Sequence, residues 1–344
     1  MSSIRMKLCK AHHCKGKPTA IANRPKKIFL APILQTSDNL IMFKNTHPTP
    51  PQVSPSQGGV CYLNGQFGPL ADAKISVLDR GFIFGDAIYE VIPAYHGQFF
   101  KFDEHMARLE RSLNEVFMIM PMTRLDFKAI FDRLLNENAA FHKLSPDLFS
   151  ASIYLQISRG VAPRDHAIPN HLAPTVFVMC QPLPAVNLKM RENGVFCITS
   201  DDFRWKKAHI KSTSLLGSIL AKELGTQKGA AETVMFRDGF LSEASSSNVW
   251  VVKNGSVIGT PTGPLVLEGI RYSVLTQLCS QLQIPLLFKP QSKEDVFHAD
   301  ELLLTSASKE ILPITRLDDQ VIGDARPGPI YHQLYAAYQN LKNS

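Results

Sequence analysis

Apolar residues alternate with polar ones in short runs along much of this chain, and each such run predicts a β-strand. The first is Val60–Leu63, followed by Asn64-Gly65, a pair that supplies the positive φ angles of a two-residue turn. A hairpin with a second strand from Gln66 is therefore expected, whereas the Pro-, Ser- and Gln-rich segment 47–59 predicts no packed element. The other predicted strands are residues 87–95, 98–102, 150–158, 175–180, 195–199, 232–236, 248–252 and 301–305.

Elsewhere the apolar residues recur every three to four positions, as they do on one face of an α-helix. In residues 104–118 the apolar stripe contains Met106, Leu109 and Leu113, with Asp103 placed to cap the helix and Arg108 expected near the edge of the stripe. The other predicted helices are residues 124–138, 214–227, 269–282 and 329–341. Both halves of the chain mix strands with helices without a βαβ repeat, which indicates an α+β fold.

A chain of 344 residues with 44% hydrophobic content is long enough for two packed domains. We expect an N-terminal extension at 1–58, a small α+β domain at 59–184 and a larger C-terminal domain at 185–344, with 181–184 as the linker. No apolar run approaches the ~18 residues that a membrane-spanning helix needs, so no membrane span is expected.

The net charge of +7 comes from the first 37 residues, which contain eight Lys or Arg and no acidic residue. The remainder is close to neutral, with 29 basic and 30 acidic residues, so nucleic acid is not expected as a partner. The leader is interpreted as a disordered arm, a targeting peptide, or an upstream extension if translation begins at Met42. Its run Cys9-Lys-Ala-His-His-Cys14 lacks a second ligand pair, so no metal site is expected. Six cysteines without regular spacing indicate reduced thiols and a cytoplasmic protein.

Lys211 stands in an apolar segment that is typical of a buried strand entering a helix. An unpaired lysine is costly to bury, so such a residue commonly has a covalent role, and Schiff-base formation with a carbonyl is the foremost one. A cofactor that acts as an electron sink needs such a lysine for its aldehyde and a carboxylate, here Glu243, to keep its pyridine nitrogen protonated. Its phosphate would bind Arg108 or the free N–H groups at Gly269-Ile270, where a helix begins.

These residues and their order resemble the fold type IV pyridoxal-phosphate aminotransferases, and within them the D-amino acid aminotransferases. The resemblance runs from about Cys61 to Tyr338, through 77–90, 103–109 and the segments around Lys211 and Glu243. It implies a small mixed α/β N-terminal domain and a larger, barrel-like α+β C-terminal domain. It also implies pyridoxal 5'-phosphate as the cofactor and a homodimer whose active sites are shared between subunits.

Carried over by position, the resemblance implies Lys211 as the Schiff-base lysine and proton shuttle, Glu243 as the partner of the pyridine nitrogen, and Leu267 as the apolar residue behind the ring. The implied phosphate contacts are Arg108, Gly269, Ile270, Ser306 and Ala307. Arg271 occupies the place of a phosphate-binding threonine in many members, and Ala307 lacks a hydroxyl that some relatives use. The phosphate would then depend on backbone amides and on Arg271 itself.

Tyr89, Arg164 and His166 match the residues that hold the substrate α-carboxylate in the D-amino acid enzymes. Because the lysine lies on one face of the cofactor, the position of the carboxylate decides which enantiomer presents its Cα proton, and this arrangement favours the D form. The implied reaction is a ping-pong transamination through an internal aldimine on Lys211. It would join a donor of the D-alanine or D-glutamate class with 2-oxoglutarate or pyruvate, and expected pocket residues Ile92, Pro93 and Ser308 leave the preferred side chain open.

Two other interpretations stay open. One is another reaction on the same scaffold: that of a 4-amino-4-deoxychorismate lyase, a branched-chain aminotransferase or an R-selective amine transaminase. The other is a non-enzymatic protein whose basic leader binds nucleic acid or an anionic membrane. The presence of Lys211, Glu243 and Arg108 together argues against this second interpretation.

Overall fold

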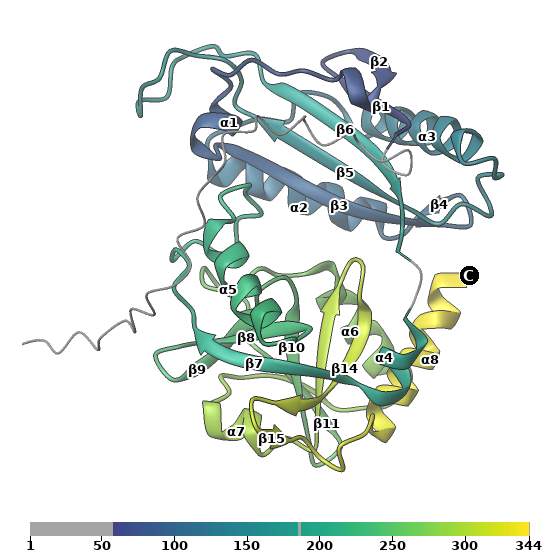
Figure 1. The fold of residues 1–344 in the computed structure, drawn as a ribbon, viewed down its shortest axis with the longest axis vertical. Coiled ribbons are helices and arrows are strands. Elements are labelled where there is room, and N and C mark those ends of the chain that lie inside the picture. The colour runs from purple at the N-terminus through teal and green to yellow at the C-terminus, as the bar shows by residue number, and fades with distance from the viewer. Residues whose placement is uncertain (1–57, 185–186, 344) are drawn as a thin grey trace, which may run out of the picture. The chain divides into compact units, whose positions relative to one another are not determined.

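The computed structural model describes residues 58–184 and 187–343, so the interpretations of the basic leader and of its Cys9–Cys14 run lie outside the described residues. The described chain contains two β-sheets, one of six strands from residues 60–182 and one of nine strands from residues 195–321, each with its own helices (Figure 1). This combination is the α+β class that the sequence predicts. The domain limits at 58 and 184 stay a prediction.

The six-stranded sheet is antiparallel throughout, in the order β2-β1-β6-β5-β3-β4. The predicted hairpin is confirmed, with φ angles of 48° at Asn64 and 93° at Gly65. A short helix, α1 (Arg80–Phe84), leads into the third strand. The strands are β1 (Val60–Leu63), β2 (Gln66–Pro69), β3 (Ala87–Tyr95), β4 (Gln98–Phe99), β5 (Ala151–Ser158) and β6 (Thr175–Pro182).

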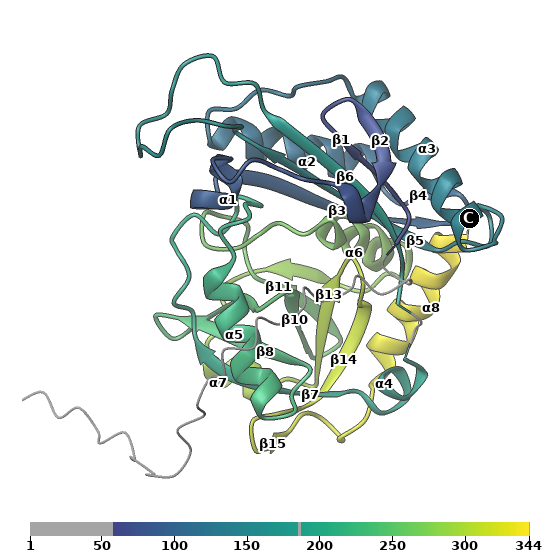
Figure 2. The ribbon, with the colours of Figure 1, turned by 45° about the horizontal axis from the view of Figure 1, so that its top comes forward.

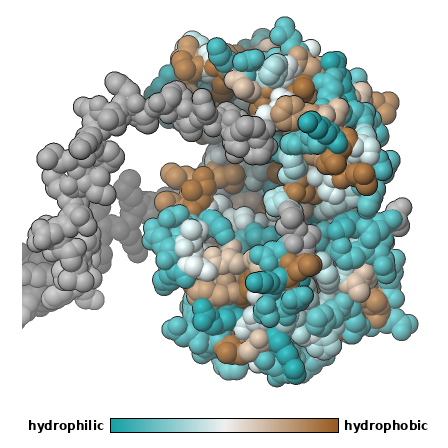
Figure 3. All heavy atoms as spheres, turned by 45° about the vertical axis from the view of Figure 1, so that its right-hand side comes forward, coloured by the Kyte–Doolittle hydropathy of each residue, from teal (hydrophilic) through white to brown (hydrophobic). Residues whose placement is uncertain are grey.

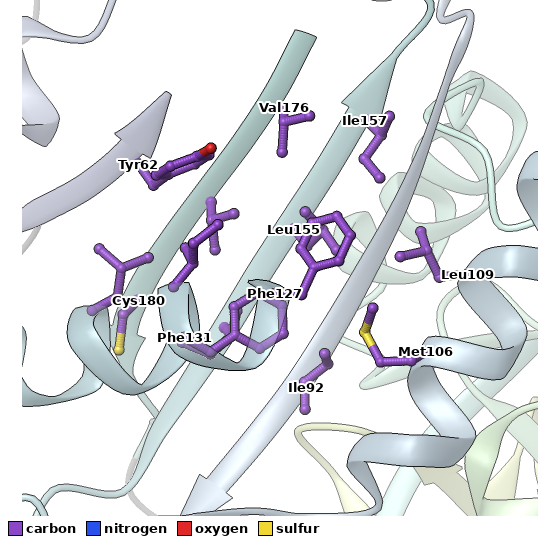
Figure 4. Packing of buried hydrophobic residues seen from close by; sticks show 14 of the residues in the cluster. Tyr62, Ile92, Met106, Leu109, Phe127, Phe131, Leu155, Ile157, Val176 and Cys180 are labelled. Carbon is purple, nitrogen blue, oxygen red and sulfur yellow. The ribbon is translucent and has the colours of Figure 1, made fainter. Parts of the chain in front are cut away.

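Helices α2 (Phe102–Glu115) and α3 (Arg124–Phe141) pack against one face of this sheet (Figure 2). The core between them is apolar and closed to solvent, with Met106 and Phe131 from the helices meeting Ile92 and Leu155 from the strands (Figure 4). Burial of such large side chains stabilises a fold by roughly 1.5–3 kcal/mol each. The packing therefore fixes α2 on β3, and α2 carries two residues of the candidate site.

The start of α2 differs from the prediction. The residue that precedes the helix is Lys101, with φ of 59° and no capping bond from its side chain, and Asp103 lies inside the first turn, so the predicted cap at Asp103 is wrong. Arg108, expected near the edge of the apolar stripe, is buried, and that prediction is also wrong. Its guanidinium is paired with the buried carboxylate of Glu90, a partner 18 residues away that a hydropathy pattern does not reveal.

The nine-stranded sheet has the order β12-β11-β10-β13-β14-β7-β8-β9, with β15 paired to β14. Its neighbours are antiparallel except for the pairs β11–β12, β14–β7 and β7–β8. Its strands are β7 (Val195–Asp201), β8 (Glu232–Arg237), β9 (Phe240–Ala244), β10 (Asn248–Lys253), β11 (Ser256–Gly259), β12 (Leu286–Phe288), β13 (Glu301–Ser306), β14 (Glu310–Leu317) and β15 (Gln320–Val321).

Alternate residues of this sheet point into two different cores, as the two-residue period of a strand requires. On β13, Leu302 and Leu304 belong to one core, whereas Leu303 belongs to the other, together with side chains of α6 and α8. The helices of this part are α4 (Leu188–Asn193), α5 (Leu216–Gln227), α6 (Ile270–Gln281), α7 (Lys293–Phe297) and α8 (Pro329–Asn343). None of the described helices is long and apolar enough to span a bilayer.

Candidate active site

A cavity of 510 Å³ opens where β3, α2, the start of α5, the β9–β10 turn and the beginning of α6 meet. This volume lies within the range of roughly 300–1,000 Å³ that is usual for small-molecule sites. Ten of the residues that the sequence implies for the site line this cavity: Tyr89, Arg108, Lys211, Glu243, Leu267, Gly269, Ile270, Arg271, Ser306 and Ala307. Two others, Arg164 and His166, do not line it.

Lys211 is held at the cavity by backbone hydrogen bonds to the beginning of β3. Tyr89 N donates to Lys211 O at 3.0 Å, and Thr213 N donates to Ala87 O at 2.9 Å. The predicted strand at Lys211 is nevertheless wrong, because only an isolated bridge at Ser212 forms there. Lys211 is also only partly buried rather than buried, because its side chain borders the cavity. Its Nζ lies 4.2 Å from the centroid of the Tyr89 ring and forms no ion pair with any other residue that the structure describes.

Glu243 lies near the end of β9 with its carboxylate surrounded by donors. Its Oε2 accepts from Leu267 N at 3.0 Å and from Asn248 Nδ2 at 3.3 Å, and its Oε1 accepts from Arg204 Nη1. Burial raises the pKa of the Glu243 carboxyl, and the Arg204 guanidinium opposes that rise. Arg204 was not expected at the site, since Asp-Phe-Arg-Trp-Lys-Lys in the sequence is typical of an exposed turn.

Arg108 belongs to a buried group of three charged or polar side chains. Its Nε and Nη2 each donate to the Glu90 carboxylate at 2.7 Å, and His105 Nδ1 contacts the same carboxylate at 2.8 Å. Burial would raise the pKa of Glu90, but Arg108 and His105 hold it well below its usual range. Burial, reinforced by Arg108 and Arg271 and opposed by Glu90, lowers the pKa of His105 to about 4. His105 is therefore neutral at pH 7, and its Nε2 has no partner among the described residues.

The first turn of α6 faces the cavity without a side-chain cap. Gly269 precedes the helix and makes no capping bond, which leaves the first N–H groups of the helix available to an anion. A Cβ at residue 269 would lie 2.2 Å from Asn248 Oδ1, so any other residue here would displace the Asn248 side chain. The Asn248 amide in turn donates to Leu267 O at 2.9 Å, so it links this turn to the segment that holds Glu243.

Arg271 lies one residue further into α6 and is 2% exposed. Its Nη2 donates to Tyr338 Oη at 2.8 Å and to Ala307 O at 3.2 Å, and its Nε has no partner among the described residues. A buried guanidinium without a carboxylate partner is unfavourable unless an anion comes to it. With the open end of α6 beside it, this donor set fits the phosphate of pyridoxal phosphate, and the lysine and the carboxylate elsewhere in the cavity fit the cofactor's aldehyde and ring nitrogen.

Arg164 and His166 lie on the exposed loop between β5 and β6. Both contact the ring of Phe84, at 5.6 Å for the guanidinium carbon and at 5.4 Å between ring centroids. Within one chain the structure therefore does not bring them to Lys211. Of the expected pocket residues, Ser308 lines the cavity, whereas Ile92 and Pro93 do not. Ile92 has the opposite parity to Tyr89 and Val91 on β3, so it points into the core instead.

Comparisons with known proteins agree with this arrangement. The family model for class IV aminotransferases matches residues 87–317. The D-alanine aminotransferase of Bacillus licheniformis is 34% identical over 278 residues, covering 81% of this chain and 95% of that relative. The D-alanine aminotransferase of Staphylococcus epidermidis is 35% identical over 283 residues, covering 82% and 98%.

Solved structures share the same fold at lower identity. The branched-chain amino acid aminotransferase of Escherichia coli matches with a TM-score of 0.75 and 22% identity, covering 83% of this chain and 94% of that one. The branched-chain aminotransferase of Thermoproteus uzoniensis matches with a TM-score of 0.72 and 23% identity. These likenesses confirm the predicted two-part α+β architecture. The family model and the D-alanine aminotransferases, at more than 30% identity over most of their length, show that this chain belongs to the class IV aminotransferases.

Proposed function

We propose that this protein is a pyridoxal-phosphate-dependent aminotransferase that moves the amino group of a D-amino acid to a 2-oxo acid. The observation that carries the proposal is a single cavity that holds an unpaired lysine, a buried carboxylate and an anion-binding helix end. The similarity to D-alanine aminotransferases supports the D-amino acid as the donor. The proposed amino donor is of the D-alanine or D-glutamate class, and the proposed acceptor is pyruvate or 2-oxoglutarate.

The residues of the cavity divide into three groups around the cofactor. Lys211 would bind its aldehyde, Glu243 would hold its ring nitrogen, and Leu267 would pack behind the ring. The phosphate would bind at the start of α6 and beside α2 and β13, through Arg108, Gly269, Ile270, Arg271, Ser306 and Ala307. When bound, pyridoxal phosphate supplies an aldehyde that combines with amines and a protonated ring that withdraws electrons from the substrate Cα.

Lys211 has the freedom that a proton shuttle needs. Its Nζ has only the face of the Tyr89 ring as a charged or aromatic partner in the described part of the chain, so no ion pair must break before it reacts. Once its nitrogen is free, Lys211 removes the proton from the Cα of the bound amino acid. Glu243, fixed by Arg204, Asn248 and the Leu267 amide, does not need to reorient during this step.

The carboxylate of the substrate would be held by Tyr89 together with Arg164 and His166 of the partner subunit in a homodimer. Two exposed apolar segments support such a partner: Val77 before α1 and Phe82 within it are 72% and 67% exposed, and Leu216 and Ile219 on α5 are 69% and 59% exposed. The hydrogen bond from Ser214 Oγ to Gly85 O, at 3.1 Å, joins these two segments. Figure 3 shows hydrophobic side chains gathered in patches between hydrophilic ones on the viewed face.

A panel of amino donors tests this function directly. The purified protein with pyridoxal phosphate is incubated with the D or L form of alanine or leucine and 2-oxoglutarate, or with the D or L form of glutamate and pyruvate, so that each transfer gives a new amino acid. We expect amino transfer from D-alanine or D-glutamate and none from the L forms. Turnover of L-leucine alone would contradict the proposal and would identify a branched-chain enzyme, and a reaction that releases pyruvate from aminodeoxychorismate would identify a lyase.

A further inference from the structure

Two arginines lie at the phosphate end of the cavity, and their charges are compensated very differently. Arg108 donates twice to Glu90, whose side chain is fully buried, so this pair carries no net charge. The remaining Arg108 nitrogen, Nη1, donates to Glu268 O at 3.1 Å. All three nitrogens of Arg108 therefore already have an acceptor before any ligand binds.

Arg271 has no such partner. Among the ion pairs of residues 58–184 and 187–343, none includes Arg271, although the residue is 2% exposed. Its acceptors are a hydroxyl and a backbone carbonyl, and its planar group lies 5.1 Å from the Phe100 ring centroid and 5.7 Å from that of Tyr338. The nearby carboxylate of Glu310 is bound by Lys342 at 2.9 Å and by Gln339 at 3.0 Å. The charge of Arg271 is thus left without a counterion in a low-dielectric site.

We propose that Arg271, and not Arg108, supplies the net positive charge that holds the phosphate group of the cofactor, while the Arg108–Glu90 pair only orients it. This inference rests on the proposed cofactor. Its physical basis is that the phosphate dianion gains little from a guanidinium that a carboxylate already neutralises, whereas the unpaired Arg271 is itself stabilised when the anion arrives. His105 adds no charge, because its ring is neutral and its Nδ1 donates a hydrogen bond to the Glu90 carboxylate.

A purely structural role for Arg271 makes a different prediction. Its contacts with Phe100, Tyr338 and Ala307 join α6 to the C-terminal helix α8 and to the segment after β4. If these contacts were its whole role, removal would weaken the binding of any ligand of the cavity to the same extent. If Arg271 neutralises phosphate, removal would weaken the binding of phosphorylated ligands only.

The test compares pyridoxal phosphate with unphosphorylated pyridoxal in equilibrium titrations of the apoprotein, followed by absorbance. Arg271→Gln removes the charge but keeps a donor for Tyr338, Arg271→Lys keeps the charge, and Tyr338→Phe removes only the hydroxyl contact. Arg316→Met, which removes an exposed arginine that stacks on Phe196, controls for the change in total charge. Inorganic phosphate serves as a competitor in each titration.

For Arg271→Gln we expect about 10- to 100-fold weaker binding of pyridoxal phosphate and inorganic phosphate, with pyridoxal changed less than about twofold. Arg271→Lys should bind pyridoxal phosphate almost as tightly as the wild type. Tyr338→Phe and Arg316→Met should change the affinity for pyridoxal phosphate little. Equal weakening of both aldehydes, or an unchanged affinity for phosphate, would overturn the inference. If the wild-type protein binds neither aldehyde covalently, the proposed function fails instead, and binding of inorganic phosphate alone still reports on Arg271.

Discussion

Arg204 Nη1 donates a hydrogen bond to Glu243 Oε1, which joins two buried side chains that are 39 residues apart in the chain. The Nε and Nη2 of Arg204 both bind Asp202, each at 2.9 Å, and Asp202 contacts Arg237 Nη2 at 3.0 Å. The carboxylate of Glu243 therefore stands at the end of a row of alternating charges. Such a row fixes both the position and the charge of the group that would face the cofactor ring.

Replacing Arg204 with methionine should raise the pKa of Glu243 further, because burial raises this pKa and the positive charge of Arg204 is the main effect that lowers it. The other groups that face Glu243, the carboxylate of Asp202 and the hydroxyl of Tyr272, do not replace the lost positive charge. We expect the ring nitrogen of the bound cofactor to lose its proton at a pH that differs by at least about one unit from the wild-type value. A pH titration of the visible absorbance measures this change, and Arg326→Met, at an exposed arginine, should leave the titration unaltered.

The buried His105 predicts a specific acid sensitivity of the fold. Its pKa is lowered from 6.5 to about 4, so the folded state resists a proton that the unfolded state accepts. Stability from this residue is complete above pH 6.5 and is lost as the pH falls toward about 4, by up to about 3 kcal/mol. Denaturant titrations between these values should show the loss in the wild-type protein and a smaller one in His105→Asn, which keeps a donor near Glu90.

The exposed His96 supplies the matched control for this experiment. His96→Asn should show the same loss of unfolding free energy as the wild type over this pH range. A wild-type protein whose stability is flat from pH 6.5 to 4 would contradict the buried, neutral state of His105. The lowered pKa of Glu90 adds a further loss of stability that begins as the pH falls below about 4.5, where the unfolded carboxylate takes up its proton.

The placement of Arg164 and His166 outside the cavity predicts complementation between two inactive variants. If these residues act on the partner's cavity, a mixed dimer of Lys211→Ala and Arg164→Ala chains contains one intact site, formed by Lys211 of one chain and Arg164 of the other. We expect each variant alone to be impaired, and the mixture, after unfolding and refolding together, to regain roughly a quarter of the wild-type rate because half of the dimers are mixed. A mixture no more active than its components would place Arg164 in the same chain's site or outside catalysis.

Much of the fold follows from periodicity, since the long strands and helices of both sheets lie within a few residues of their predicted positions. The missed elements have physical reasons. Strand β14 contains Pro313, which lacks the N–H of a sheet ladder and argues against a central strand, yet it pairs with both β13 and β7. Helices α1 and α7 have only five residues each, too few to show a helical period.

The candidate site likewise contains residues that the sequence predicts and residues that it does not predict. Lys211, Glu243 and the start of α6 stand out in the sequence because their types and their order resemble a known family. Arg204, Glu90 and His105 do not, since their partners are distant in the sequence and charged residues are normally exposed. A charged side chain at the edge of a predicted apolar stripe, such as Arg108, is the one signal in the sequence that a buried acid could lie opposite to it.

The central claim is that Lys211 is the residue that bears the cofactor, and chemical trapping tests it most directly. The protein is incubated with pyridoxal phosphate, reduced with borohydride, digested and analysed by mass spectrometry. We predict the phosphopyridoxyl group on the peptide that contains Lys211, and its absence in Lys211→Ala. A label on Lys222, which also lines the cavity, or an unmodified Lys211 in the wild-type protein would contradict the account.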